Sequence, residues 1–292
     1  MTTRLRTWAL IAGLTGLLIA VGALIGGLVL WLFVAGAVAM NLIGYLYSDR
    51  LALRAARARP LTRQQAPDLF AIAGDLADRA QIPIPRLYVM PGQQPNAFAT
   101  GRDQRHAAVA MTTGLLEDLE TEQVRGVLAH EFARIKNRDI LVSSVAAMVA
   151  GAISAVASIL QLSFLFGSHD QDSPLGSLAA MILAPLGAML IQMGVSRQRE
   201  YLADATAAHI LGTSVPLADA LQTIHASRLP ALNINPVTAP MYIINPVAGQ
   251  RLANLFSTHP PVQDRIRRLR AYNESRTSRT TGPSKMRTAQ AR

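Results

Sequence analysis

A histidine and a glutamate lie side by side in the stretch VLAHEFARIKNRD, residues 127–139. They are His130 and Glu131, and the fourth residue after the histidine is Arg134. A histidine at position 134 would complete H-E-x-x-H, in which two imidazoles on one helix face bind zinc and the glutamate acts as general base. With arginine there, the stretch is compatible with a zinc protease, with a protease that has lost its metal, or with an accidental likeness.

A third zinc ligand would have to come from elsewhere, because a catalytic zinc takes three protein ligands and a water. The stretch SRQREYLADATAA offers Glu200 as that ligand, with Asp204 one helical turn later. Asp204 could accept a hydrogen bond from the ring of His130 and fix its tautomer. A pair of carboxylates at this spacing is more often a solvated helix surface, so the pair alone is weak evidence.

Arg134 is a poor substitute for a histidine ligand, because guanidinium stays protonated and has no lone pair for a metal. Its planar fork can instead pair with carboxylates. We therefore expect Arg134 to bridge to Glu131, to Glu200 or to both, in roughly the space that zinc would fill. Four other histidines are candidates by type, and packing or surface positions explain them better: His106, His209, His225 and His259.

The composition favours a membrane protein. Half of the 292 residues are hydrophobic and 16% are charged, against about 25% in a soluble domain. The net charge of +10 accompanies this apolar character, so we assign it to anionic membrane lipids as partners and not to nucleic acid. No cysteine is present, which excludes disulfides and cysteine ligands.

Four apolar segments predict two transmembrane hairpins, residues 8–47 and 140–195. A cleaved signal peptide is the alternative for the first segment, and a buried core hairpin is the alternative for the second pair. Arginine and lysine flank the hairpins, while the turn GSHDQDSP between the last two segments has neither. The positive-inside rule therefore places both termini and the polar chain of this multi-pass cell-membrane protein in the cytoplasm.

Two polar stretches, residues 48–139 and 196–272, are expected to fold together as one cytoplasmic domain, because a membrane hairpin returns the chain to its point of entry. The first contains an expected helix in QAPDLFAIAGDLADRAQ, a strand in RLYVM, and a strand in HAAVAMTTGLL that turns at Thr113-Gly114. Thr121 is the expected N-cap of the His130 helix. Residues 273–292 are predicted to be a disordered basic tail.

Two more motifs bear on binding. PNAFATG, which contains Asn96, and AAVAM are expected to be strands at the edge of the cleft, where an extended peptide could add as a further strand. A plain hairpin is the alternative. The basic stretch HPPVQDRIRRLR is interpreted as a solvated or lipid-facing helix; a sharper interpretation has Arg265 or His259 assisting transition-state charge.

Together, the segments MNLIGYLYSDRLALR, PRLYVMPGQQPNAFATGRDQRHAAVAMTTGLL, VLAHEFARIKNRDI, SRQREYLADATAA and LFSTHPPVQDRIRRL resemble the HtpX-type membrane zinc metalloproteases, bacterial relatives of the CAAX prenyl protease family. The resemblance implies a mainly α fold with a small β-sheet, two transmembrane helical hairpins and a gluzincin-like cytoplasmic metalloprotease domain. It also implies one zinc ion per chain and cleavage of damaged, unfolded or misassembled membrane proteins.

Carried over residue by residue, the resemblance makes His130 the first zinc ligand, Glu131 the catalytic base and Glu200 the third ligand. It suggests Asn96, His259 and Arg265 as substrate or transition-state contacts. Arg134 departs from the family pattern at the second ligand. Three hypotheses follow: a working zinc endopeptidase, a pseudoprotease that binds clients or partners without cleaving them, or a sequence variant of a normal enzyme, since arginine and histidine codons differ by one base.

Overall fold

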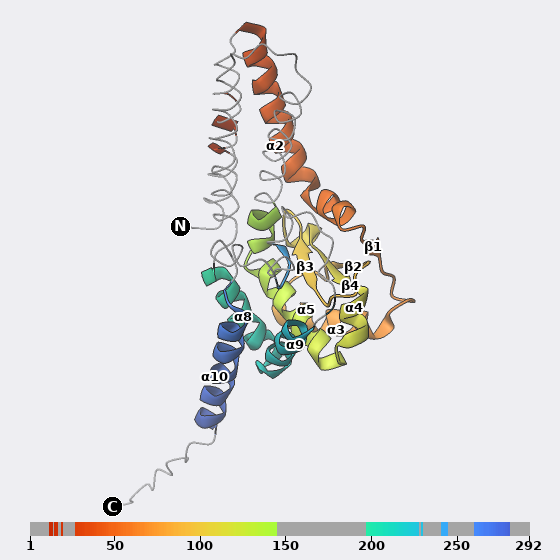
Figure 1. The fold of residues 1–292 in the computed structure, drawn as a ribbon, viewed down its shortest axis with the longest axis vertical. Coiled ribbons are helices and arrows are strands. Elements are labelled where there is room, and N and C mark those ends of the chain that lie inside the picture. The colour runs from red at the N-terminus through yellow and green to blue at the C-terminus, as the bar shows by residue number, and fades with distance from the viewer. Residues whose placement is uncertain are drawn as a thin grey trace, which may run out of the picture.

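The computed structural model describes residues 27–144, 197–227, 229, 241–244 and 260–280, together with 12–13, 15–16 and 19 near the start of the chain. Side chains are described for most of these residues. Within them the fold is mainly helical with one small sheet, as expected from the sequence (Figure 1).

The sheet is mixed and has the strand order β1-β2-β4-β3. Its strands are β1 (Arg59–Pro60), β2 (Arg86–Met90), β3 (Ala97–Thr100) and β4 (Ala108–Thr112). β2 and β4 are parallel, while β1 pairs with β2 and β3 pairs with β4 in antiparallel fashion. The expected strand RLYVM is β2. β3 is an outer strand, whereas AAVAM, expected at the cleft edge, forms the inner strand β4.

The described helices pack beside this sheet and against one another. They are α2 (Gly27–Ala55), α3 (Pro67–Ala80), α4 (Thr113–Asp118), α5 (Thr121–Lys136), α8 (Arg197–Leu211), α9 (Val215–Ala226) and α10 (Val262–Thr280), with a 3-10 turn η1 (Gln104–His106). α2 projects away from the sheet, α8 and α9 pack against α5, and α10 packs against α9 and α8 (Figure 1). α3 confirms the amphipathic helix expected before β2; it begins at Pro67 and ends at a left-handed Gln81.

α5 is the central helix of the core. Its residues from Gly126 to Ile135 are buried without a break, including the polar side chains of His130, Glu131 and Arg134. It packs against α8 and α9 from the second polar stretch and against α3 and β3 from the first. The two polar stretches therefore share one hydrophobic core, as the sequence predicted, and α5 is the element that joins them.

Three local expectations were wrong. Glu120, not Thr121, caps α5: its side chain accepts from the backbone of Gln123, whose own side chain accepts from the Glu120 N–H at 3.2 Å. Thr113-Gly114 begins the short helix α4 and is not a turn, because the Thr112 hydroxyl caps the N–H of Leu115 at 3.1 Å.

The third correction concerns the C-terminal tail. α10 continues to Thr280, so residues 273–280 are helical and the predicted disorder does not begin at 273. Charged residues at the end of α10 suit an exposed helical extension as well as a disordered segment, and composition does not separate the two. Residues 281–292 lie outside the described residues.

The predicted membrane hairpins fall mostly outside the described residues. The second apolar segment lies in α2, but most of the first segment and residues 145–195 are not described. Over the part of the chain that is described, a search for a helix with the length and apolar character needed to cross a bilayer finds none. The bounds of both hairpins stay predictions.

The close approach of α5 to α9 generates a test at Gly126. A Cβ on Gly126 would lie 2.5 Å from the carbonyl carbon of Pro216 and 2.6 Å from the N of Leu217, both backbone atoms. Glycine to alanine in a helix interior normally stabilises by about 1 kcal/mol. At Gly126 we expect the opposite sign, a loss of about 1–3 kcal/mol in the free energy of unfolding, because the two helices must separate.

Gly74→Ala in α3 is the matched control, since a Cβ there meets no atom within 4 Å. It should raise the free energy of unfolding by up to about 1 kcal/mol. Both variants are compared with the parent by chemical unfolding followed by circular dichroism. Equal stabilisation by the two substitutions would contradict the close α5–α9 packing.

Candidate active site

Two helices bring together the histidine and the two carboxylates that the sequence singled out. α5 supplies His130, and α8 supplies Glu200 and Asp204; all three side chains are buried. Nδ1 of His130 lies 2.9 Å from Oδ1 of Asp204, and Nε2 lies 3.5 Å from Oε2 of Glu200. The expectation that both carboxylates reach the His130 helix is confirmed. Asp204 holds one ring nitrogen, so the other is directed at Glu200.

α10 adds Arg265 to this cluster. Its Nε and Nη2 donate to the two carboxylate oxygens of Asp204 at 2.9 and 2.7 Å, a bidentate pair. Nη1 donates to the carbonyl of Ile243 at 2.7 Å and lies 3.9 Å from Oε2 of Glu200. Arg265 therefore orients Asp204, and through it the imidazole of His130.

The expectation of a solvated or lipid-facing basic helix is wrong for Arg265, which is 1% exposed. It holds for Arg267, whose side chain is 78% exposed. It holds also for Arg268 and Arg270, which are exposed, while Arg268 stacks over the ring of Tyr201 at 3.9 Å and Arg270 donates to Gln222 of α9. Only the arginine that meets a buried carboxylate is inside, because an unpaired guanidinium is too costly to bury.

Arg134 lies one helical turn after His130 on the same face of α5 and is also buried. Its Nη1 donates to the carbonyl of Met241 at 2.6 Å and to Oε2 of Glu131 at 3.2 Å, and Nη2 lies 3.5 Å from the Ser143 hydroxyl. The expected bridge from Arg134 to Glu131 is confirmed. The other carboxylate oxygen of Glu131, Oε1, is buried and has no hydrogen-bond partner among the described residues.

The electrostatics of the cluster follow from these contacts. Burial alone would lower the pKa of His130, but its hydrogen bonds to Asp204 and Glu200 outweigh burial and raise that pKa. Burial would raise the pKa of Asp204, but the charge and hydrogen bonds of Arg265 lower it. The carboxylates of Asp204 and Glu200 therefore favour the charged form of His130, and the guanidinium of Arg265 favours the ionised form of Asp204.

The two arginines are held in their charged form by the same carboxylates. Burial would lower the pKa of Arg134, and the negative charges of Glu131, Glu200 and Asp139 raise it. Arg265 behaves alike, with Asp204 as its main partner. Two guanidiniums thus supply positive charge beside the buried carboxylates of Glu131, Glu200 and Asp204.

The residues present do not fit a complete catalytic zinc site. His130 Nε2 and Glu200 Oε2 face one another and are suitable donors, but Arg134, at the second-ligand position of the family pattern, has no lone pair for a metal. No cluster of three or more His, Cys, Asp or Glu residues able to hold a metal occurs in the described part of the chain. Two donors fall short of the three that a catalytic zinc takes.

The remaining candidates from the sequence are dispersed or already engaged. His106, His209 and His225 are exposed, in agreement with their interpretation as surface residues. His259 lies outside the described residues. Asn96 is buried and its side-chain amide donates to the carbonyl of Ile244 at 2.8 Å, so it contacts the chain's own backbone.

Two groups near the site were not expected from the sequence. The backbone carbonyls of Met241 and Ile243 accept hydrogen bonds from the two buried arginines. A backbone acceptor cannot be predicted from a pattern of side chains. Asp139 lies 3.6 Å from Arg199, and burial raises its pKa to about 6 despite the nearby positive charges. The charged pair flanking the predicted hairpin, Asp139 before it and Arg199 after it, was a signal that could have been used.

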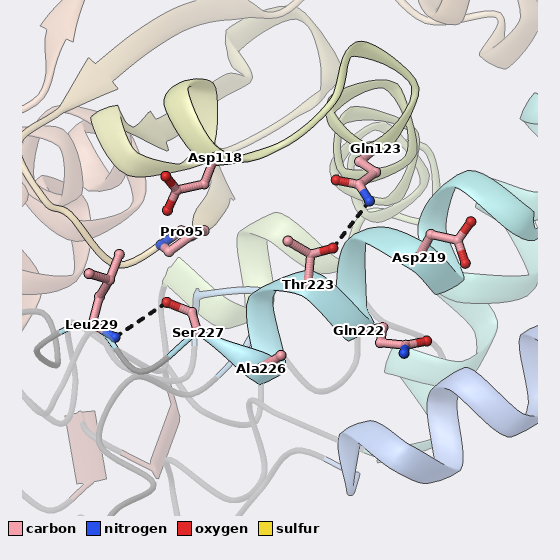
Figure 2. A pocket seen from close by; sticks show the side chains of 9 residues that line it. All are labelled: Pro95, Asp118, Gln123, Asp219, Gln222, Thr223, Ala226, Ser227 and Leu229. Carbon is pink, nitrogen blue, oxygen red and sulfur yellow. Dashed lines mark hydrogen bonds between the residues drawn. The ribbon is translucent and has the colours of Figure 1, made fainter.

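A separate cavity of about 750 Å³ lies between α4, α5 and α9. Figure 2 shows Pro95, just before β3, facing Asp118 and Leu229, while Gln123 of α5 donates to Thr223 of α9 at 3.1 Å. None of the predicted site residues lines this cavity. It is therefore distinct from the His130 cluster.

Comparisons with known proteins agree with the geometry. The family model described as Peptidase family M48 matches residues 63–273. A protein named "Protease HtpX homolog" from Pelotomaculum thermopropionicum is 45% identical over 276 residues, which cover 91% of this chain and 98% of that protein. Another of the same name from Thermococcus sibiricus is 48% identical over 282 residues, covering 93% and 96%.

A solved structure has a similar fold. The crystal structure of S. mikatae Ste24p superposes with a TM-score of 0.53 at 19% sequence identity. The match covers 88% of this chain, and the chain spans 62% of the Ste24p chain. At this level of identity the likeness concerns the fold alone.

The buried Arg265–Asp204 pair predicts a large effect of removing one partner. Arg265→Met should lower the free energy of unfolding by about 3–5 kcal/mol, because Asp204 would remain buried without its compensating charge. Arg267→Met, on the exposed face of the same helix, should change it by no more than about 0.5 kcal/mol. Urea unfolding of the detergent-purified variants measures both.

Adding Asp204→Asn to Arg265→Met separates the lost charge pair from lost packing. Neutralising the stranded carboxylate should recover part of the stability. If the double variant is no more stable than Arg265→Met alone, the ion pair is not the reason that Arg265 is buried.

Proposed function

Because the chain belongs to peptidase family M48, we propose that it is an HtpX-type membrane protein that engages damaged or misassembled membrane proteins at the α5–α8 site. By family it is a metallopeptidase, a class of hydrolase. Whether this chain hydrolyses a bound client or only binds it depends on whether the side chains around His130 can hold a catalytic zinc ion.

The membrane location is supported by composition and by α2. The chain is half hydrophobic, and α2 carries large apolar side chains with little cover, such as Leu28 at 75% and Trp31 at 68% exposed. Unpaired apolar surface of this kind is costly in water and suits lipid contact. We place both termini and the site in the cytoplasm, following the distribution of arginine and lysine.

One observation supports binding over cleavage: the buried guanidinium of Arg134 stands where the family pattern has the second zinc ligand. It contacts Glu131, the residue that the family pattern makes the catalytic base, and it holds a peptide carbonyl at 2.6 Å. A guanidinium can donate hydrogen bonds to the carbonyls of a polypeptide, but it has no lone pair with which to complete a metal site.

We therefore favour a protein that binds client segments and whose zinc-dependent hydrolysis is impaired. The second candidate, a working zinc endopeptidase, is supported by family membership and by the facing donors of His130 and Glu200. A sequence variant of a normal enzyme would share that second function, and resequencing the gene identifies it.

Arg134→His tests the choice between the two candidates. The substitution removes the buried positive charge and supplies an imidazole four residues after His130, the spacing that zinc sites use. We expect the parent chain to hold well under one zinc per chain and to show no casein cleavage. The histidine variant should approach one zinc per chain and gain cleavage. Metal content and proteolysis are measured on the same detergent-purified samples.

Arg134→Met is the matched control, because it removes the charge without adding a ligand. It should remain low in zinc and inactive. A parent chain that already binds one zinc and cleaves as fast as Arg134→His would refute the impaired-hydrolysis proposal and require another ligand.

The topology proposal is tested with single cysteines, which the cysteine-free chain allows. A cysteine at Ser173, in the turn between the last two apolar segments, should react with an impermeant maleimide added to intact cells. A cysteine at Ser284, in the C-terminal tail, should react only after permeabilisation. The same labelling of both positions in intact cells would rule out two hairpins with cytoplasmic termini.

A further inference from the structure

The outer edge of β3 is already paired with a segment from far along the chain. Ile243 donates its N–H to the carbonyl of Ala97 at 2.9 Å, and Tyr242 forms an antiparallel bridge with Phe98. The side chain of Asn96 holds both backbone groups of Ile244, donating to its carbonyl at 2.8 Å and accepting from its N–H at 3.5 Å. Residues 241–244 thus use the hydrogen-bonding groups that an outer strand offers to an added strand.

The two site arginines hold the same segment. Arg134 donates to the carbonyl of Met241 at 2.6 Å, and Arg265 donates to the carbonyl of Ile243 at 2.7 Å. The acceptors are two residues apart, which is the repeat of an extended chain. The segment is therefore bound by β3 and by guanidiniums that also contact Glu131 and Asp204 of the catalytic cluster.

These contacts are directed mainly at backbone atoms. Each of these hydrogen bonds between the segment and Ala97, Asn96, Arg134 or Arg265 uses an N–H or C=O group of residues 241–244. The aromatic contact of Tyr242 with Phe98, at 5.0 Å between ring centroids, depends on the side chain. Because every polypeptide has the same backbone, another extended segment could make the same hydrogen bonds.

We propose that residues 241–244 act as an internal ligand of the β3 edge, where they compete with an extended client polypeptide for the same backbone contacts. This inference rests on the proposed function, in which clients are engaged at this site. An internal segment competes at a high effective concentration. A client therefore binds only in the fraction of molecules whose edge is free, and its apparent affinity is reduced by that fraction.

A disulfide between positions 98 and 242 tests the competition directly. Directly opposed residues of an antiparallel pair have Cα atoms about 4.5–5.5 Å apart, within the range that a disulfide spans. The chain has no cysteine, so Phe98→Cys with Tyr242→Cys gives one defined cross-link. Binding of fluorescent, cysteine-blocked casein is measured by anisotropy with the full chain in detergent, before and after reduction.

The oxidised double variant should bind casein at least about tenfold more weakly than the same protein after reduction. The two single-cysteine variants should not respond to reductant. Non-specific attraction between casein and the basic chain is the same in both redox states and cancels. Equal binding by the oxidised and reduced forms overturns the internal-ligand proposal while leaving client binding itself intact.

Ile243 provides an independent test that needs no cross-link. Ile243→Pro removes the N–H that Ala97 accepts, whereas Ile243→Ala keeps it; both lose the buried side chain. The proline variant should bind casein several-fold more tightly than the alanine variant, because more molecules have a free edge. Equal affinities contradict the proposal. If neither variant, the parent nor the reduced double-cysteine protein binds casein, the proposed function fails together with it.

Discussion

The bidentate ion pair between Arg265 and Asp204 is the contact on which the arrangement of the site depends. It connects α10 to α8, and Asp204 in turn holds Nδ1 of His130 on α5. Three helices from distant parts of the sequence are thereby fixed at one buried point. Such a pair is stable only when both charges are present and satisfied, so the orientation of His130 toward Glu200 is a consequence of α10 packing in its observed place.

Arg134 changes the chemistry of this cluster, while the contacts among His130, Asp204 and Arg265 are still formed. The family position that a second imidazole would occupy carries a permanent cation, and the neighbouring carboxylates are compensated by guanidinium. A metal site and an arginine network meet the same electrostatic need, the presence of positive charge among buried carboxylates. They differ in what they offer a polypeptide: guanidinium supplies hydrogen-bond donors for carbonyl groups.

The β3 edge and the two buried arginines all form hydrogen bonds with the backbone of residues 241–244. β3 supplies the strand pairing, Asn96 supplies a side-chain amide, and the two arginines supply donors from the helical side. The arrangement gives a physical account of why Asn96 is buried beside the edge strand: its amide satisfies the backbone groups of Ile244 where regular pairing ends. Backbone recognition of this kind is independent of sequence and suits clients that share only an extended conformation.

By itself, the sequence determined the chemistry of the site and much of the local structure. The spacing of His130, Glu131 and Arg134 predicted one helix, and the E-x-x-x-D pattern placed Glu200 and Asp204 on another. The apolar segments between the two helices implied a hairpin that returns the chain and brings them together. Helix α3 and strand β2 follow from local periodicity and proline placement, which depend on near neighbours alone. The N-cap at Glu120 and the start of α4 at Thr113 were missed because competing polar side chains lay within one residue of each boundary. Only the tertiary structure decided that Arg265 is buried while Arg267 is solvated, since both are arginines on one helix and the difference lies in the partner that each meets. It also decided that residues 241–244 lie on the β3 edge, because the backbone hydrogen bond from Ile243 to Ala97 joins residues nearly 150 positions apart and depends on no pattern of side chains.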